Sequence, residues 1–457
     1  MDVHLRSTTV CALDAETGEA VTRRFRGNPW GEVAEWMSGF PGPSLAAYES
    51  GYLGFAPQRE LSGLGVDCVV AAVSRVPRSA ADLSSKNDRN DAARMAKAIL
   101  SHDISPVWVP SPEIEGLRDL AGAHDAATAR LAAAKQRLLA FLARRGYAYG
   151  GTTPAGNPRR YWTYDFLRWL DKVRPADDGG IRALAALRNE VEAAAETRDD
   201  LLAEYRAAVA AGPLSAEVEA LQSIKGCGFA LAAAFASEVG DFSRFRSGRQ
   251  VTSYFGLAPK QRSSADSVRL GGISGAGDAL VRRLAVEGSW SYVQASHQPK
   301  LMPKGSGVPL EVRMHGRKGS ERLLRRREEM LARGMPQAKA NAATAAELVR
   351  WLWALGAMCR RQPNRHSPRP GEPGSLRGYP RFRWARGSGR MRVVRLGEPR
   401  RRRGLRAAGA VSADMRLSRR RRRHAGGGPG RVQRQAPPTD CKRSAGPLWL
   451  LTADWVI

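Results

Sequence analysis

Residues 5–26 read LRSTTVCALDAETGEAVTRRFR, and this stretch decides the fold of the first part of the chain. Two runs rich in β-branched and apolar residues, Thr8–Leu13 and Val21–Phe25, flank a polar turn at Asp14–Glu19. Two short runs of this kind joined by turn-forming residues are typical of a β-hairpin. We therefore predict a hairpin at the start of the chain, on which the following segments build.

Beyond the hairpin, helical and strand patterns alternate. Helices are predicted near Trp30–Met37 and over Tyr52–Leu61, and apolar strands over Leu45–Tyr48 and Val66–Val73. A hairpin followed by strands that alternate with helices indicates a mixed α/β layer around a central sheet. An α/β fold is thus expected for the N-terminal part.

Two long amphipathic segments follow. Apolar residues recur at spacings of three, four and seven over Glu113–Arg145 and again over Leu184–Val209. Such helices usually pack as an antiparallel hairpin or a coiled coil. The stretch Gly150–Pro158, rich in Gly, Thr and Pro, is predicted to be a loop or insertion between them.

The last third divides into an ordered and an unusual part. Leu214–Val293 has its own turn signals and is predicted to be a compact unit, and Ala342–Met358 is a strongly apolar helix. Residues 365–457 hold 24 Lys and Arg against 5 Asp and Glu, so they carry +19 of the net charge of +29. A segment so charged is not expected to fold. It is a frameshifted extension, a nonspecific nucleic-acid arm or a specific functional domain, and the sequence leaves these three interpretations open.

The composition of the 457 residues narrows the class of protein. A net charge of +29 indicates a polyanionic partner, with nucleic acid as the first candidate. The sequence contains no run of 18 apolar residues and no signal-peptide pattern, so we expect a soluble, cytoplasmic protein without a membrane partner. The five cysteines lie far apart, without the spacing of zinc ligands or of a disulfide framework.

Four acidic residues carry the first chemical signal. Asp2 lies by the first strand, Glu49 closes a later strand, and Asp88 and Asp91 open a helix on one of its faces. Gathered carboxylates bind magnesium, and a pair of such ions can stabilise the attacking and leaving oxygens of phosphodiester chemistry. The alternative is structural, with Asp88 and Asp91 as charges that the helix macrodipole favours and the other two as surface residues.

The segments around these acids resemble the acidic motifs of the DEDD transposases of the insertion-sequence 110/1111 family. They read MDVH at 1–4, AYESG at 47–51 and KNDRNDA at 86–92. The resemblance implies an N-terminal RuvC-like domain of RNase H fold. It also implies that the four acids hold Mg²⁺ and act as catalytic residues. In the family a hydrophobic half-strand precedes the first aspartate, so the natural start is expected upstream of Met1. His4 stands where a polar residue is common, and a solvated or sheet-edge role is equally compatible with it.

A second motif reads LQSIKGCG at 221–228, ahead of an alanine-rich helix. It is similar to the glycine turn that opens the family's second domain, with Lys225 in place of the usual proline. A Gly-x-Gly turn at a helix N-terminus can present backbone N–H groups to a phosphate, so Gly226 and Gly228 are candidate DNA-binding residues. A simple tight turn is the alternative.

The block YFGLAPKQRSSA at 254–265, with GGISGAG at 271–277 behind it, closely resembles the part of the family that carries a nucleophilic serine. The matching position is Ser264, in a segment predicted to be turn-like, with Ser263 as its neighbour. Without the resemblance, an exposed Ser-Ser pair is usually a turn former. The basic residues of the block are candidate phosphate clamps: Lys260, Arg262, Arg269, Arg282 and Arg283.

The chain departs from the family pattern at several points. Ala265 replaces a glycine, which puts a backbone conformation with positive φ or a close approach to DNA in doubt. Gly275 and Ala276 replace residues that are usually basic. The resemblance ends near Arg360, so the tail has no counterpart.

The resemblance, together with the composition of the tail, predicts four segments. These are a RuvC-like DEDD domain at 1–110, a long-helix coiled-coil segment with an insertion at 111–213, a mainly α-helical serine-containing transposase domain at 214–362, and an Arg-rich disordered or frameshifted tail at 363–457.

The activity that the resemblance implies is that of a transposase or site-specific recombinase. Such an enzyme, associated with the bacterial nucleoid, cuts and rejoins DNA through a serine-linked intermediate as a homodimer or homotetramer, and in some members a structured guide RNA selects the target. Two alternatives stay open. A metal-dependent RNase H-fold nuclease or junction resolvase would not need Ser264, and an inactive DNA-binding remnant would bind DNA without cutting it.

Overall fold

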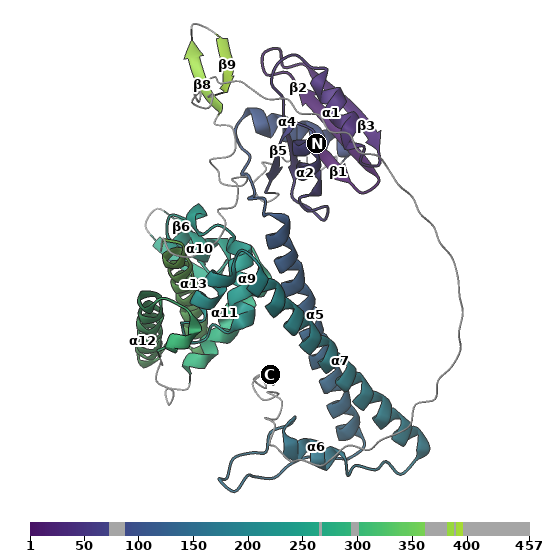
Figure 1. Cartoon of the computed structure of the whole chain (residues 1–457), viewed down its shortest axis with the longest axis vertical. Helices are drawn as coiled ribbons and strands as arrows, with labels where there is room; N and C mark the ends of the chain where they lie inside the picture. The colour runs from purple at the N-terminus through teal and green to yellow at the C-terminus, as the bar shows by residue number, and fades with distance from the viewer. Residues whose placement is uncertain (73–86, 265–266, 294–300, 362–381, 388–389, 396–457) are drawn as a thin grey trace, which may run out of the picture. The chain divides into compact units, whose positions relative to one another are not determined.

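The computed structural model describes residues 1–72, 87–264, 267–293, 301–361, 382–387 and 390–395 (Figure 1). The described residues of Met1–Phe141 and Asp177–Leu396 belong to one compact unit. Leu142–Ala176, which we call the insertion unit, belongs to a second one and is described by itself.

The N-terminal part opens with three antiparallel strands, β1 (Asp2–His4), β2 (Ser7–Leu13) and β3 (Ala20–Arg26). β2 and β3 form the predicted hairpin, in register from Ser7 opposite Arg26 to Leu13 opposite Ala20. The turn is stabilised by Asp14, whose side chain accepts hydrogen bonds from the backbone N–H groups of Glu16 and Thr17. The predicted hairpin is confirmed.

Two parallel strands, β4 (Leu45–Glu49) and β5 (Asp67–Ala71), continue this layer. The amino group of Met1 donates to the Ala47 carbonyl oxygen at 2.7 Å and so links the start of β1 to β4. The helices α1 (Trp30–Ser38) and α2 (Ala56–Gly63) connect the strands, as predicted. The predicted mixed α/β layer is thus confirmed, although α2 begins four residues later than the pattern indicated.

Both faces of β4 and β5 are buried, because successive side chains point to opposite faces of a strand. Tyr48 and Val70 pack on the side of Val33 and Leu61, which belong to α1 and α2. The alternate positions Ala47, Val69 and Ala71 pack against Met95 and Ala98 of α4 (Asp88–Leu100). The sheet is therefore sandwiched between α4 on one face and α1 with α2 on the other.

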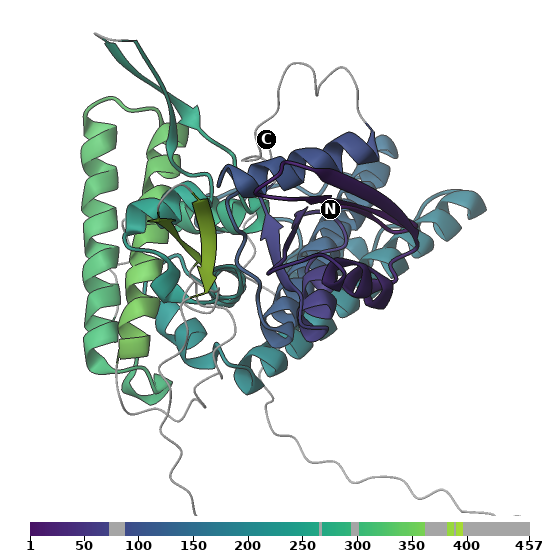
Figure 2. The same cartoon turned by 90° about the horizontal axis from the view of Figure 1, so that it is seen from above.

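The two predicted long helices are α5 (Pro112–Arg144) and α7 (Asp178–Ala211). They run side by side (Figures 1 and 2) and in opposite directions, because Gly212 lies beside Leu117 while Arg137 forms an ion pair with Glu190. The connection between them is the insertion unit, which holds a short helix, α6 (Tyr164–Leu170), that the sequence pattern did not reveal.

The C-terminal helices surround α13 (Gln337–Arg361), the longer counterpart of the helix predicted at 342–358. Leu348, Val349, Leu352 and Leu355 of α13 are fully buried. α12 (Leu310–Ala332) lies along α13, and sequence reasoning missed it because eleven of its residues are Lys, Arg or Glu. The other helices are α8 (Ser215–Leu221), α9 (Phe229–Val239), α10 (Gly248–Tyr254) and α11 (Ala279–Ser289), with 3-10 turns η2 (Phe242–Arg244), η3 (Trp290–Tyr292) and η4 (Lys304–Ser306).

A β-hairpin projects from these helices (Figure 2) and consists of β6 (Pro259–Ser264) and β7 (Ser267–Ile273). We call it the serine hairpin. In the tail, where no element was expected, the structure describes the paired strands β8 (Phe382–Gly387) and β9 (Arg390–Arg395). The expectation of a disordered or frameshifted tail stays a prediction. Residues 396–457 lie outside the described part.

Within the described ranges, no helix is both long and apolar enough to cross a membrane.

Candidate functional site

The four acids Asp2, Glu49, Asp88 and Asp91, which we call the acidic cluster, come from three separate segments. β1 positions Asp2, the end of β4 positions Glu49, and the first turn of α4 positions Asp88 and Asp91. α4 starts at this point because the Asn87 side chain caps it by accepting from the Asn90 N–H at 2.8 Å. The fold therefore brings together residues that are up to 89 positions apart.

One part of the acidic cluster has the geometry of a cation site. Ligand atoms of Asp2, Asp88 and His4 all lie within 4.8 Å of one another. His4 Nε2 is 3.1 Å from Asp2 Oδ2, and Arg24 Nη2 is 3.5 Å from Asp88 Oδ2. His4 thus lies next to the acids in space, a point that the sequence analysis had left open beside a solvated or sheet-edge role.

The other part is bridged by an arginine that the sequence analysis did not single out. Arg94 Nη2 lies 2.9 Å from Glu49 Oε1, and Arg94 Nη1 lies 2.7 Å from Asp91 Oδ1. Its side chain is 13% exposed. The sequence feature that could have indicated the ion pair with Asp91 is the spacing, because Arg94 lies three residues after Asp91 and therefore next to it on the helix surface. The structure thus divides the four acids into one pair with His4 and one pair around Arg94.

The electrostatics of the acidic cluster favour a bound cation. Burial raises the pKa of Asp2 and the charges of Asp88 and Asp91 raise it further, although His4 acts in the opposite direction. A buried carboxylate that is repelled by its neighbours gains from a nearby positive charge. The donor set fits a divalent ion, since Asp2 and Asp88 supply the oxygen ligands that Mg²⁺ prefers and His4 adds a nitrogen that Mn²⁺ accepts more readily.

Ser264 is the last residue of β6 and lies opposite Ser267, so it ends a strand rather than occupying the predicted turn. The strands pair because Gln261 to Ser264 match Ser267 to Leu270 residue by residue, which also sets Arg262 opposite Arg269. Residues 265–266, between the two strands, are not among the described residues. The departure at Ala265 therefore lies outside the described residues.

The base of the serine hairpin is held by two glycines in the left-handed region. Gly256 has φ +68°, and a Cβ there would overlap the backbone of Ala276. Gly277 has φ +76°, and a Cβ there would overlap the Tyr254 carbonyl oxygen. The chain therefore crosses itself at the hairpin base so closely that a side chain cannot be accommodated at either position.

The candidate phosphate clamps occupy different environments. Lys260 is exposed. Arg282 Nη1 donates to the backbone oxygens of Phe255 at 3.1 Å and Ala276 at 2.9 Å, which fastens the hairpin base to α11. Arg283 forms ion pairs with Asp125 of α5 and Glu287. Both arginines thus have structural partners within the protein.

The glycine turn at 226–228 leads into α9, with Gly228 as the exposed residue before its first turn. Gly226 has φ +85°, and a Cβ there would lie 2.5 Å from the Gly288 carbonyl oxygen. Gly226 therefore permits a close backbone contact with α11, whereas the space around Gly228 is open. The geometry leaves Gly228 as the accessible member of the pair.

The comparisons with known proteins assign this combination of sites to a class. The profile of a DEDD transposase family matches residues 1–145, and the profile described as "Transposase IS116/IS110/IS902 family" matches residues 218–303. These features define a DNA transposase, and a DEDD domain implies an RNase H-like fold for the N-terminal α/β layer.

Individual relatives point to the same family. The chain is 33% identical over 320 residues to the putative transposase y4qE of Sinorhizobium fredii, covering 68% of this chain and 75% of the relative. It is 25% identical over 285 residues to the transposase of insertion sequence IS1533 of Leptospira borgpetersenii, covering 60% and 79%. It is 28% identical over 212 residues to the transposase of IS1111A of Coxiella burnetii, covering 45% and 54%. The chain belongs to the IS110 family of insertion-sequence transposases.

Proposed function

We propose that this transposase cuts and rejoins DNA through a covalent bond to Ser264, assisted by a cation at the acidic cluster. The observation that supports the proposal most is the position of Ser264, at the end of a strand in a projecting hairpin and inside the segment matched by the family profile. A residue near a hairpin tip can reach a DNA backbone without the helical core having to approach the duplex.

In the first step the Ser264 hydroxyl loses its proton and its oxygen forms a bond to phosphorus. The bond between phosphorus and one deoxyribose oxygen breaks, and that oxygen takes up a proton. One strand end is then a phosphoserine ester and the other a free hydroxyl. Attack on the ester by the hydroxyl of another strand joins the new strands and releases the serine.

The charges near Ser264 suit a phosphate. Arg262 and Arg269 are opposite each other in the register of the serine hairpin, and arginine is a residue that commonly contacts phosphate in DNA complexes. Gly228 at the start of α9 and the exposed Lys260 are further candidates for backbone contacts with DNA.

Asp2 and Asp88, with His4, would hold the cation, which when bound supplies positive charge next to the reacting phosphate. Glu49 and Asp91 complete the DEDD set when Arg94 is displaced from between them. Until then the Arg94 guanidinium supplies part of the positive charge that the acids require.

We also propose that the antiparallel pair α5 and α7 acts as a coiled-coil element for a homodimer or homotetramer, since long amphipathic helices commonly serve this purpose. A structured guide RNA is the proposed source of target choice. The protein would then contact backbone and shape, and base pairing would select the sequence.

The test is a denaturing gel for protein–DNA adducts, with junction DNA from the element's ends, its flanking transcripts and Mg²⁺. Wild type is compared with Ser264→Ala, with Asp88→Ala and with the matched neighbour Ser263→Ala. We expect an adduct in wild type and in Ser263→Ala, and none in the other two variants. Treatment with ribonuclease before the reaction should prevent it if a guide RNA is used.

Two results would contradict the proposal. Free cleavage products that depend on Asp88 but not on Ser264 would favour the metal-dependent nuclease or junction resolvase. Binding to DNA without any cleavage under all metal conditions would favour an inactive DNA-binding protein.

A further inference from the structure

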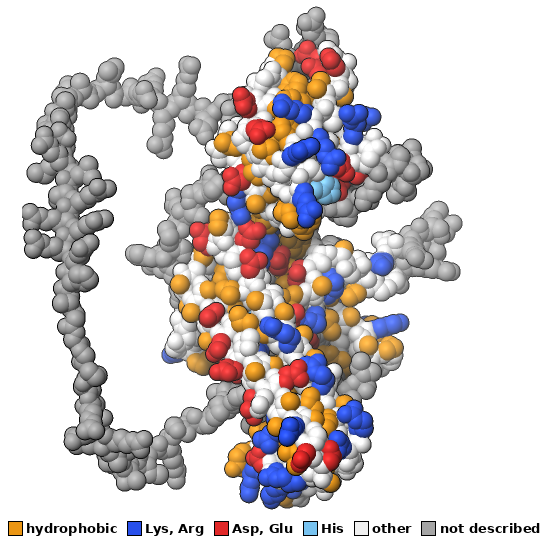
Figure 3. Space-filling model, turned by 90° about the vertical axis from the view of Figure 1, so that its right-hand side faces the viewer, with side chains coloured by type: hydrophobic (Ala, Val, Ile, Leu, Met, Phe, Trp, Pro, Cys, Tyr) orange, Lys and Arg blue, Asp and Glu red, His pale blue; other side chains and the backbone are white. Residues whose placement is uncertain are grey.

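The insertion unit, Leu142–Ala176, has a composition unlike the rest of the chain. Its 35 residues include seven of the chain's 32 aromatic side chains, and they hold 7 Lys and Arg against 2 Asp and Glu. Figure 3 shows many Lys and Arg side chains exposed on the face of the molecule that it draws. Sites for single-stranded nucleic acid commonly combine aromatic side chains, on which bases stack, with basic side chains that contact the backbone.

The aromatic residues form a cluster around one buried ring. Phe166 of α6 is fully buried, and the ring of Tyr149 lies 5.2 Å from it and that of Trp169 5.6 Å. Tyr149 and Trp169 are 5.3 Å apart and are themselves half-buried. They are in contact with each other, so a flat ligand would stack on their outer faces and would not insert between them.

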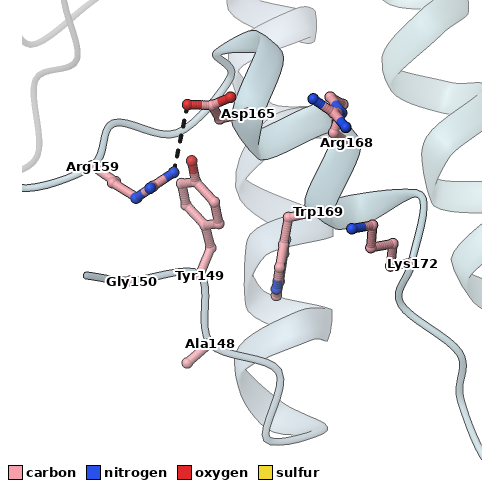
Figure 4. Close-up of a pocket in the computed structure, with 8 residues that line it drawn as sticks. All are labelled: Ala148, Tyr149, Gly150, Arg159, Asp165, Arg168, Trp169 and Lys172. Carbon is pink, nitrogen blue, oxygen red and sulfur yellow. Dashed lines mark hydrogen bonds and ion pairs between the residues drawn. The ribbon is translucent and has the colours of Figure 1, made fainter. Parts of the chain in front are cut away.

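These two rings line a cavity of about 440 Å³ that is contained entirely within the insertion unit (Figure 4). This volume lies within the range of small-molecule sites and is large enough for a nucleotide. Figure 4 shows Tyr149 on the loop that follows α5 and Trp169 on α6, with Arg168 and Lys172 on either side of Trp169 along the chain. The cavity thus has aromatic faces with cations beside them.

The charge of the lining favours an anion. The lining holds three cations, Arg159, Arg168 and Lys172, and one carboxylate, Asp165, which lies 3.4 Å from Arg159 Nη1. The Asp165 charge is therefore compensated by Arg159, and the other two cations give the site a net positive charge. Arg168 is also held 5.7 Å above the Tyr164 ring. The backbone of Trp162, which packs on Phe166, has φ +61°, an unusual conformation for a bulky residue and one that clusters at binding sites.

We infer that the insertion unit binds an unpaired nucleotide of a nucleic-acid strand, with the base stacked on Trp169 or Tyr149 and the neighbouring phosphates on Arg168 and Lys172. This site is additional to the proposed acidic cluster and serine hairpin, and it requires neither for binding. It is suited to a single strand, because the bases of a duplex are stacked on each other and do not offer their faces.

The test uses the full chain and short single-stranded oligonucleotides, and it locates each crosslink so that binding elsewhere in the chain is told apart from binding at this site. DNA and RNA tetranucleotides are photocrosslinked to the protein, and the crosslinked peptides are identified by mass spectrometry. We expect a crosslink at Tyr149 or Trp169. An excess of single-stranded competitor should lower its yield far more than an equal excess of duplex competitor. The ratio of the DNA to the RNA yield identifies which strand the site prefers.

The variants are chosen to keep the aromatic cluster packed. Trp169→Leu and Tyr149→Leu retain apolar volume but lose the ring face, and each should reduce the crosslink yield at this site by roughly fivefold or more. Arg168→Ala with Lys172→Ala should also reduce it. The matched control, Arg160→Ala with Arg182→Ala, removes the same charge from exposed positions outside the cavity and should leave the yield unchanged.

The inference is overturned if no crosslink falls within the insertion unit, if duplex competes as well as single strand, or if the control pair lowers the yield as much as Arg168→Ala with Lys172→Ala does. Crosslinking between two copies of the chain at Tyr149 or Trp169 in place of nucleic acid would also overturn it. Ser264→Ala and Asp88→Ala should not change the yield, so a failure of the proposed catalytic mechanism would leave this result intact.

Discussion

The acidic cluster and the serine hairpin are built in opposite ways. The acids come from three distant segments and meet because a sheet covered on both faces holds β1, β4 and α4 in fixed positions. Ser264 comes from a local hairpin of adjacent strands, and its position depends on a close backbone crossing at Gly256 and Gly277. One site is thus fixed by side-chain packing in a core and the other by the absence of side chains at a crossing, so different substitutions should damage each.

The largest effect is expected at the hairpin base. Gly277→Ala places a Cβ against the Tyr254 carbonyl oxygen at a positive φ, and we expect it to lower the free energy of unfolding by about 3 to 4 kcal/mol. Gly275→Ala is the control, because φ is also positive there (+71°) but the space is open, and about 1 kcal/mol should be lost. Denaturant unfolding measures both values. Equal losses would show that the crossing is not what holds the hairpin.

A comparison of Arg282 with Lys260 distinguishes a structural role from a DNA-contacting role at the base of the serine hairpin. Its hydrogen bonds to backbone oxygens predict that Arg282→Ala lowers the unfolding free energy by about 2 kcal/mol. The exposed Lys260→Ala should change stability by less than about 0.5 kcal/mol but reduce the salt dependence of DNA binding by about one counterion. If the two variants behaved in the reverse way, Arg282 would be the phosphate clamp.

Arg94 tests how the acidic cluster is held together. Removing it in Arg94→Ala leaves Glu49 and Asp91 to repel each other, and we expect a loss of about 1 to 2 kcal/mol in the absence of divalent ions. Mg²⁺ should restore more stability to this variant than to wild type. Arg24→Ala serves as the control, since Arg24 is 65% exposed and its pair with Asp88 should contribute little. A variant that Mg²⁺ stabilises no more than wild type would argue against a cation at these two acids.

The smallest effect concerns pH. Because the pKa of Asp2 is raised from 3.8 by burial and by neighbouring acids, the folded state binds this proton more tightly than the unfolded state does. The unfolding free energy of wild type should therefore fall as pH rises from 3.8 through the higher folded pKa. The Asp2→Asn variant lacks this loss. Its free energy of unfolding relative to that of wild type should therefore rise towards neutral pH, and the two values should agree below pH 3.8.

Asp14 is the control for Asp2, because its pKa is shifted in the opposite direction. The backbone N–H groups of Thr17 and Glu16 lower its pKa below 3.8, so the folded state stabilises its charged form. Asp14→Asn should be less stable than wild type above pH 3.8, and the difference should shrink as pH falls through the lowered pKa. Urea unfolding across this pH range distinguishes the two, and the same trend in both variants would contradict the assignment of causes.

Sequence reasoning succeeded where the information is local. The hairpin at 5–26 and the long helices were predicted because alternation and helical periodicity are properties of neighbouring residues. α12 was missed, because its many charged residues hide the apolar face that packs on α13. Arg94 was missed for a different reason. The spacing of three residues could have indicated its pair with Asp91, but only the folded sheet brings Glu49 next to α4, so no local pattern could show that the Arg94 guanidinium lies between two of the acids.

Small residues make much of the contact between α4 and the sheet: Ala98 packs with Ala47 and Ala71, and Ala92 and Ala96 pack with Cys11 of β2. Small side chains let the helix axis approach the strands closely, and this determines how far Asp88 and Asp91 must reach. The alanines therefore act as spacers that set the distances between carboxylates. Enlarging one of them, as in Ala96→Leu, should move the acids apart and alter cation binding while every acidic residue stays in place.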